Sequence, residues 1–148
     1  MTDPARILVI DDDESIRKVL TAALEDEGYL VDVAEDGKQA IKKSNAGFYN
    51  LALIDIRLPD MEGTKLLSEM KETNPKMVKI IVTGYPSLQN AIEAVKKGAN
   101  DYVIKPFKME SVLETIKRHL KEQQEEREYS EEKVKKYIET RADELSRH

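Results

Sequence analysis

Three carboxylates of this chain stand directly after short apolar runs. Asp11 and Asp12 follow the run Ile7–Ile10, and Asp55 follows the run Leu51–Ile54. Continuous apolar runs of this kind are typical of strands that are covered on both faces in a parallel sheet. Because parallel strands end at the same edge of a sheet, where α/β proteins bind their ligands, we expect these acids to share one crevice. Taken alone, Asp55 has a simpler alternative interpretation, in which it only caps the next element.

A hydroxyl and a lysine are predicted to reach the same edge. Thr83 follows the run Val78–Val82, and Lys105 follows the run Tyr102–Ile104. Clustered carboxylates are costly unless a cation joins them, and hard oxygen ligands without cysteine or histidine favour Mg²⁺ over zinc or copper. An ammonium group, a hydroxyl and Mg²⁺ together suit a phosphoryl group. We therefore predict a site that holds one phosphoryl group, with Asp55 as its acceptor.

The hydrophobic pattern between these runs indicates strict alternation of strands and helices. The predicted strands cover residues 7–10, 30–34, 51–54, 78–82 and 102–104. The predicted helices begin near Ser15, Gly37, Thr64, Leu88 and Met109, and the third of them is expected to run to Thr73. Strict alternation implies right-handed crossovers and a parallel sheet. The predicted fold class is therefore α/β, a doubly wound, flavodoxin-like sheet of five strands in the order 2-1-3-4-5 with helices on both faces and a C-terminal helical extension.

The overall composition disfavours several kinds of partner and site. The 148 residues carry a net charge of −5, so we expect this chain to bind no nucleic acid. There is no cysteine, which excludes disulfides and cysteine zinc sites, and the two histidines, His119 and His148, are far in sequence from the acidic residues above. No apolar run approaches the length of a membrane span, and the first residues do not resemble a signal peptide. We therefore expect a cytoplasmic protein without membrane contact.

The last part of the sequence differs in composition from the rest. From about Lys117 onward it is rich in lysine, arginine and glutamate and has no proline or glycine, which favours a long helix, with an interruption expected near Tyr129 and Ser130. We accordingly divide the chain into a domain of residues 1–122 and a charged helical extension of residues 123–148. The extension is either a solvated helix or a segment that dimerises weakly or docks on a partner. Its few apolar residues are Val134, Tyr137, Ile138 and Leu145.

Four motifs resemble one protein family. They are ILVIDDD (Ile7–Asp13), LIDIRLPDMEG (Leu53–Gly63), IVTGYP (Ile81–Pro86) and GANDYVIKPF (Gly98–Phe107). In this order, at the ends of the first, third, fourth and fifth predicted strands, they resemble the receiver domains of two-component response regulators, close to the chemotaxis regulator in architecture. The resemblance covers about residues 5–122. It implies a switch that is phosphorylated by a sensor histidine kinase and acts on a downstream protein target, and that catalyses only its own phosphotransfer and autodephosphorylation.

The resemblance also implies roles for single residues. Asp55 would receive the phosphoryl group from a phosphohistidine of the kinase. Asp12, Asp55 and the backbone carbonyl of Arg57 would hold Mg²⁺. Asp11 would act on the ion largely through water. Lys105 would bind the phosphoryl group and would pair with Asp55 before phosphorylation.

The same resemblance implies a switch element next to the site. Thr83 would move toward the phosphoryl oxygen, and Tyr102 would turn inward behind it. The alternative for Tyr102 is a half-exposed aromatic side chain on a strand. The Lys105–Pro106 bond resembles the cis peptide of the family. Asp13 would be an exposed residue at the start of a helix.

Three other functions remain as alternatives. The chain could relay its phosphoryl group to a histidine phosphotransfer protein. It could also be a fragment of a DNA-binding regulator, since the stretch from Asp55 to Gly63 resembles receivers of enhancer-binding transcription regulators. A Mg²⁺-dependent phosphatase of the haloacid-dehalogenase type is disfavoured, because that class needs a second aspartate where this chain has Arg57.

Overall fold

Ten elements alternate strictly between strand and helix in the computed structural model, which describes residues 3–147. The strands are β1 (Arg6–Ile10), β2 (Leu30–Ala34), β3 (Leu51–Asp55), β4 (Val78–Thr83) and β5 (Asp101–Ile104). The helices are α1 (Glu14–Asp26), α2 (Gly37–Ala46), α3 (Gly63–Glu69), α4 (Leu88–Lys96) and α5 (Met109–Ser146).

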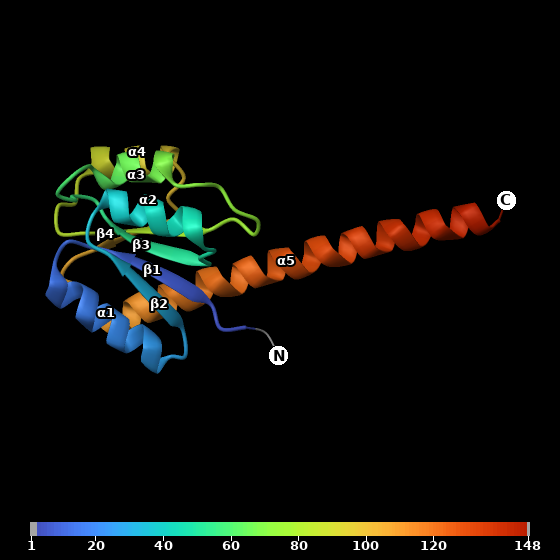
Figure 1. The fold of residues 1–148 in the computed structure, drawn as a ribbon, viewed down its shortest axis with the longest axis horizontal. Coiled ribbons are helices and arrows are strands. Elements are labelled where there is room, and N and C mark those ends of the chain that lie inside the picture. Colours follow the sequence, from blue (N-terminus) through green and yellow to red (C-terminus); the bar gives the residue numbers. More distant parts are fainter. Residues whose placement is uncertain (1–2, 148) are drawn as a thin grey trace.

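All five strands pair in parallel in the order β2-β1-β3-β4-β5, which confirms the predicted fold class. Helices α2, α3 and α4 cover one face of the sheet, and α1 and the first part of α5 cover the other (Figure 1). The strand order reverses between β1 and β3, so the connections after these two neighbours leave toward opposite faces. In open α/β sheets, the carboxyl ends of strands at such a reversal are where ligands bind.

Two hydrophobic cores hold the helices against the sheet. Alternate residues of each strand point to opposite faces, so Ile54 joins the core under α2, α3 and α4, whereas Leu53 joins the core under α1 and α5. Leu24 of α1 and Ile116 of α5 are fully buried in the second core. Every residue of β3 is buried, which explains the uninterrupted apolar run that ends at Asp55.

Helix α1 begins one residue earlier than the sequence indicates. The Asp13 carboxylate accepts hydrogen bonds from the backbone N–H of Ser15 at 2.8 Å and of Ile16 at 3.3 Å. Asp13 is therefore the N-cap, and it satisfies two of the donors that the first turn leaves free. This exposed capping role agrees with the expectation for Asp13.

Helix α3 is shorter than predicted and ends at Glu69, because the chain becomes extended at Met70. The Met70 side chain is buried in the core beneath α3, which takes the backbone off the helical path. The segment that follows forms a local turn instead of continuing the helix. In this turn the Thr73 hydroxyl donates to the Pro75 carbonyl at 2.7 Å and accepts from the Met77 N–H at 3.1 Å. The prediction of helix as far as Thr73 was therefore wrong.

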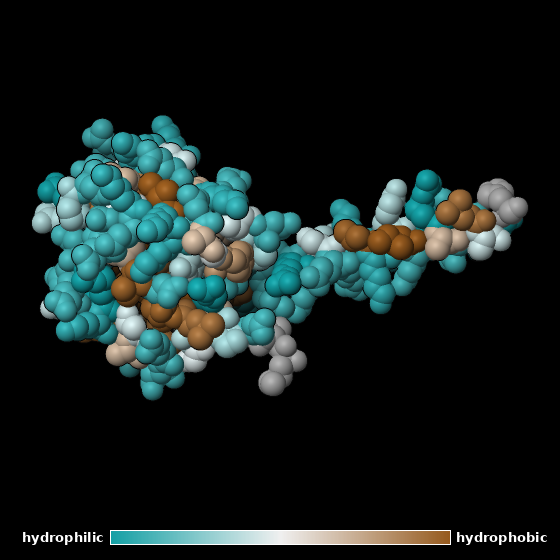
Figure 2. Space-filling view, in the orientation of Figure 1, coloured by the Kyte–Doolittle hydropathy of each residue, from teal (hydrophilic) through white to brown (hydrophobic). Residues whose placement is uncertain are grey.

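Helix α5 continues without interruption from Met109 to Ser146, so the break expected near Tyr129 and Ser130 is absent. Its second half projects away from the domain as a single rod (Figure 1). Hydrophobic side chains lie along one side of this rod among many charged ones (Figure 2). Across residues 3–147, no helix combines the length and apolar character needed to cross a membrane.

Candidate functional site

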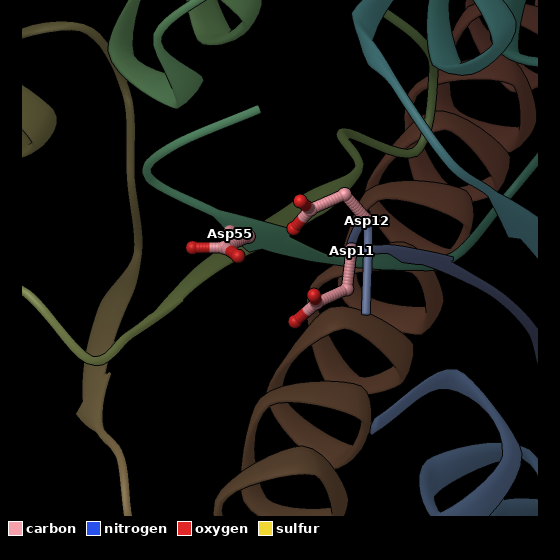
Figure 3. Close-up of side chains that lie close together, drawn as sticks. All are labelled: Asp11, Asp12 and Asp55. Carbon is pink, nitrogen blue, oxygen red and sulfur yellow. The ribbon is translucent and has the colours of Figure 1, made fainter. Parts of the chain in front are cut away.

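Three carboxylates meet at the carboxyl edge of the sheet. Asp11 and Asp12 follow β1, Asp55 ends β3, and these two strands are neighbours in the sheet. One carboxylate oxygen of each lies within 4.8 Å of the others, and Figure 3 shows their side chains directed into a shared space. Asp11 and Asp55 are buried, whereas Asp12 is exposed. The predicted convergence of these carboxylates at one edge of the sheet is therefore confirmed.

Lys105 supplies the positive charge of the cluster. Its ammonium group lies 2.7 Å from an Asp11 oxygen and 3.5 Å from an Asp55 oxygen. Asp11 is thus the stronger partner, whereas the resemblance implied a pair with Asp55. The bond to Pro106 is cis, and the Lys105 N–H donates to the Thr83 carbonyl at 2.7 Å, which joins the ends of β4 and β5 beside the cluster.

Burial sets the electrostatics of the cluster. Burial and then the neighbouring charge of Asp11 raise the pKa of the Asp55 carboxyl above its ordinary value, against the opposing charge of Lys105. Burial works against the charge of Lys105, but its hydrogen bond to Asp11 and the charges of both aspartates outweigh that effect and raise the pKa of the ammonium group. The site therefore has an excess of negative charge that a cation would relieve.

The loop after β3 passes close against the backbone of Asp55. A Cβ placed on Gly63 would lie 2.4 Å from the Asp55 carbonyl oxygen and 2.9 Å from the Ile56 Cα. The Gly63 N–H donates to the Ile56 carbonyl at 2.6 Å. Glycine is needed here because the start of α3 packs on the strand end that carries Asp55, and not because the backbone takes an unusual turn conformation.

The same loop is also tied to α2. The Asp60 carboxylate accepts hydrogen bonds from the N–H groups of Gly37 at 2.8 Å and Lys38 at 3.0 Å. Asp60 therefore caps α2 from another part of the chain, and these bonds hold the pKa of its carboxyl below the ordinary value. No sequence motif near Asp60 signals this contact, because its partners lie more than 20 residues earlier in the chain.

Thr83 ends β4, whereas Tyr102 lies on β5 at the level of Ile81, two residues earlier along β4. Val82 pairs with Asp55 in the sheet, so Thr83 lies one residue beyond the level of Asp55. The buried Thr83 hydroxyl accepts a hydrogen bond from the Tyr85 N–H at 2.9 Å. Tyr102 packs against the core under α4, and its hydroxyl is buried without a hydrogen-bond partner among the described residues. In this structure the ring of Tyr102 is thus directed inward.

Two large side chains connect the loops on either side of the site. The Arg57 guanidinium lies over the ring of Tyr85, 4.1 Å from the ring centroid. Arg57 belongs to the loop after β3, and Tyr85 belongs to the loop after β4. The Arg57 N–H also donates to the Asp55 carboxylate at 3.3 Å, so Arg57 contacts Asp55 through its backbone and the neighbouring loop through its side chain.

A family model for the response regulator receiver domain matches residues 7–117. This chain belongs to the response regulator receiver family. Receiver domains are the signalling modules of two-component systems, and the predicted function class is therefore confirmed. The match spans all five strands and the first part of α5, which is the region that builds the acidic cluster.

Relatives in sequence and structure agree with this assignment. The transcriptional regulatory protein ZraR of Escherichia coli is 39% identical over 118 residues, which cover 80% of this chain and 27% of that protein. The crystal structure of a CheY-like receiver domain protein from Methanospirillum hungatei superposes with a TM-score of 0.80 at 45% identity, covering 83% of this chain and 98% of that one. A response regulator from Burkholderia pseudomallei, solved with a phosphorylated aspartic acid, calcium and citrate, gives a TM-score of 0.72 at 32% identity over 83% of this chain and 72% of that one. The present chain therefore spans about a quarter of ZraR.

The raised pKa of Asp55 predicts that this carboxylate lowers the stability of the metal-free domain. Ionisation of Asp55 is easier in the unfolded chain than in the folded one. The resulting loss in the free energy of unfolding is absent below the ordinary carboxyl pKa of 3.8 and grows as the pH rises through the raised pKa of the folded state. We expect Asp55→Asn to increase the free energy of unfolding at pH 7 by about 1 kcal/mol, or roughly 2–4 °C in melting temperature. Thermal unfolding in chelator at pH 7 and near pH 3.5 measures this. An equal gain at both pH values would contradict the electrostatic explanation.

Proposed function

We propose that this receiver domain is a phospho-accepting switch in which Asp55 takes a phosphoryl group from a phosphohistidine of a sensor kinase. The observation that carries the proposal is the meeting of Asp11, Asp12, Asp55 and Lys105 at one sheet edge. A lone carboxylate could only cap a helix, but three carboxylates and an ammonium group form a charged site that suits phosphoryl transfer. The phosphorylated aspartic acid in the Burkholderia pseudomallei regulator supports this chemistry by similarity.

The transfer needs a carboxylate that is fixed in position and not protonated. An Asp55 oxygen attacks phosphorus, the bond between phosphorus and the histidine nitrogen breaks, and its electron pair returns to the imidazole, which takes up a proton. Lys105, already 3.5 Å from Asp55, compensates the charge of the phosphoryl oxygens. The close packing of Gly63 on the Asp55 backbone holds the acceptor in a fixed position at the end of β3.

The donor set of the cluster fits Mg²⁺. Hard oxygens lie within 4.8 Å of one another, and no cysteine is present in the chain. We propose that Asp12, Asp55 and the backbone carbonyl of Arg57 hold the ion directly and that Asp11 acts through water. The bound ion would supply positive charge that neutralises the carboxylates and the phosphoryl oxygens.

The proposed partners follow from this chemistry. A sensor histidine kinase supplies the phosphoryl group, a downstream protein receives the signal, and the chain catalyses only its own phosphotransfer and autodephosphorylation. Because the phosphoryl group derives from ATP in such a kinase, we propose a cytoplasmic location. We retain the division into a receiver domain of residues 1–122 and a helical extension of residues 123–148.

A second candidate is favoured by the lengths of the relatives. Aligned residues make up only 27% of ZraR, a transcriptional regulatory protein. The domain could accordingly serve as the receiver part of a larger transcription regulator, with α5 leading toward the rest of it. In that case the phosphorylation chemistry at Asp55 is the same, and only the output differs.

We expect Asp55 to be the sole acceptor of phosphate. Incubation with acetyl phosphate and Mg²⁺ should add one phosphoryl group to the parent protein, as measured by intact mass, and none to Asp55→Asn. Asp12→Asn should label at least tenfold more slowly, because a direct ligand of the ion is weakened. Asp13→Asn is the matched control, since asparagine also caps helices well and Asp13 lies outside the cluster. Full labelling of Asp55→Asn, or equal slowing in both other variants, would refute the assignment.

Thr83 is proposed to couple phosphorylation to Tyr102. In the present state the Thr83 hydroxyl oxygen accepts from the Tyr85 N–H and keeps its own proton for donation to a phosphoryl oxygen. A shift of the Thr83 side chain toward that oxygen would pull on the bond to the loop after β4 and so pass the change on. We expect Thr83→Ala to accept phosphate but to show at most half of the NMR shift change at Tyr102 on addition of beryllofluoride. Unchanged shift differences at Tyr102 would separate Thr83 from the switch.

The projecting part of α5 is proposed to self-associate weakly. Its exposed apolar residues have no partner within the described chain, and burying them would favour a second copy of the helix. Deleting residues 125–148 should leave the labelling of Asp55 and the thermal transition nearly unchanged, but should abolish concentration-dependent sedimentation of the phosphorylated form. Identical sedimentation of the two proteins up to high concentration would leave a solvated helix as the correct interpretation. The residues concerned are Tyr129, Val134, Tyr137, Ile138 and Leu145.

A further inference from the structure

Helix α5 leaves the domain at a single buried polar residue. Gln123 is 8% exposed, and every residue from Gln124 to Arg147 is exposed. Gln123 follows Val112, Ile116 and Leu120 on the face of α5 that packs against the sheet. A glutamine therefore stands where this apolar face ends and the projecting part of the helix begins.

The amide of Gln123 uses both its nitrogen and its oxygen to bind the domain. Its Nε2 donates to the backbone carbonyl of Asn50 at 2.9 Å and to that of Lys76 at 2.8 Å. Its Oε1 accepts from the Asn50 Nδ2 at 3.1 Å. Three hydrogen bonds thus join α5 to the residue before β3 and to the loop before β4, and we call this group of bonds the amide clamp.

Asn50 extends the amide clamp to a third strand. Its side-chain oxygen accepts from the Arg6 N–H at 2.9 Å, and its own N–H donates to the Arg6 carbonyl at 2.8 Å. Its carbonyl also accepts from the Val78 N–H at 3.0 Å. The amide clamp is therefore attached to the starts of β1, β3 and β4, which are the three strands whose other ends carry the acidic cluster and Thr83.

Few other contacts hold the helix at this point. Within residues 3–147, the hydrogen bonds and ion pairs that join residues after Leu120 to parts of the domain other than α5 all come from Gln123. Gln123 also lines two grooves, one of about 990 Å³ beside Asn74 and Lys76, and one of about 760 Å³ beside Pro4 and Phe48. Because open space flanks the helix at both grooves, packing there does not restrain its direction.

The projecting part has the means to remain a helix. It continues a helix that is already packed, so no new nucleation is needed, and each further residue adds one backbone hydrogen bond. Side-chain contacts within it, such as Gln124 to Glu128 at 3.0 Å and Arg127 to Glu131 at 3.2 Å, add small contributions. At 1.5 Å per residue the exposed part is about 35 Å long, so a small change of angle at Gln123 moves its tip by several ångströms.

We propose that Gln123 is a positioning residue that fixes the direction in which α5 leaves the receiver domain. The amide clamp makes the domain and the projecting helix one rigid body. The orientation of the helix relative to the domain is therefore fixed when the helix contacts another molecule. This inference goes beyond the phosphorylation chemistry and does not depend on it. The apolar residues before Gln123 anchor the helix to the sheet, whereas the amide sets its angle.

Pairs of spin labels can test the proposal, because the cysteine-free chain accepts two labels without background. One label replaces the exposed Lys42 on α2 and the other replaces the exposed Lys136 on the projecting helix. Pulsed electron paramagnetic resonance then measures the distribution of distances between the two spin labels. We expect a narrow distribution in the parent, and at least a twofold broader one in Gln123→Ala with the helix signal in circular dichroism unchanged.

Two further variants make the test specific. Gln124→Ala is the matched control, because Gln124 is exposed and its side chain contacts only Glu128 of the same helix. Its distribution should equal that of the parent. Gln123→Glu keeps the size of the side chain but loses both donors to the carbonyls of Asn50 and Lys76, and should broaden the distribution even if Gln123→Ala fails to fold.

Three results would overturn the proposal. The first is a narrow, unshifted distribution in the folded Gln123 variants, and the second is equal broadening in Gln124→Ala. The third is loss of helix signal in the Gln123 variants, which would make the residue a determinant of helix formation and not of direction. Labelling of Asp55 by acetyl phosphate in the same proteins shows separately whether the phosphorylation chemistry is intact, so the two proposals can fail independently.

Discussion

Repulsion among carboxylates held at one edge of a buried sheet is the constraint on which the rest of this structure depends. Asp11 and Asp55 are buried where β1 and β3 end, with Asp12 beside them, and Lys105 offers only one positive charge in return. Such an arrangement costs stability and persists only when the surrounding fold enforces it. The same excess of negative charge would favour a bound cation, so the loss of stability and the proposed ion binding have one electrostatic origin.

The loops around the cluster show how the fold enforces it. Gly63 lets α3 start directly on the backbone of Asp55, and Asp60 fastens the same loop to the first turn of α2. The Arg57 guanidinium then stacks on Tyr85 of the next loop. The first two contacts fix backbone, and the third joins two loops through their side chains. The backbone of Asp55 is therefore held by steric fit, while its carboxylate oxygens contact only the Arg57 N–H and Lys105 among the described hydrogen bonds.

The strands of the sheet connect two groups of residues at their opposite ends. The carboxyl ends of β1, β3 and β4 carry Asp11, Asp55 and Thr83, and their starts are bound together by Asn50 and Gln123. Strands of five or six residues are roughly 17–20 Å long, so the two edges are separate in space but share a stiff framework. The projecting part of α5 therefore shares this framework with the acidic cluster, although the two are attached at opposite ends of the strands.

The sequence alone determined the strands, the sheet order and the identity of the clustered residues, because apolar runs ending in Asp55 or Lys105 are local signals with one consistent topology. It did not predict that Lys105 lies nearer to Asp11, a residue 94 positions earlier, than to Asp55. Nor did it show that Gln123 binds Asn50 and Lys76, 73 and 47 positions away. Such choices among nearby partners are decided by distances of an ångström or less, which only the packing of the folded chain fixes. The unbroken course of α5 through Tyr129 and Ser130 has a different cause, since a helix that is already nucleated needs only to be propagated, and its lysine- and glutamate-rich sequence favours that.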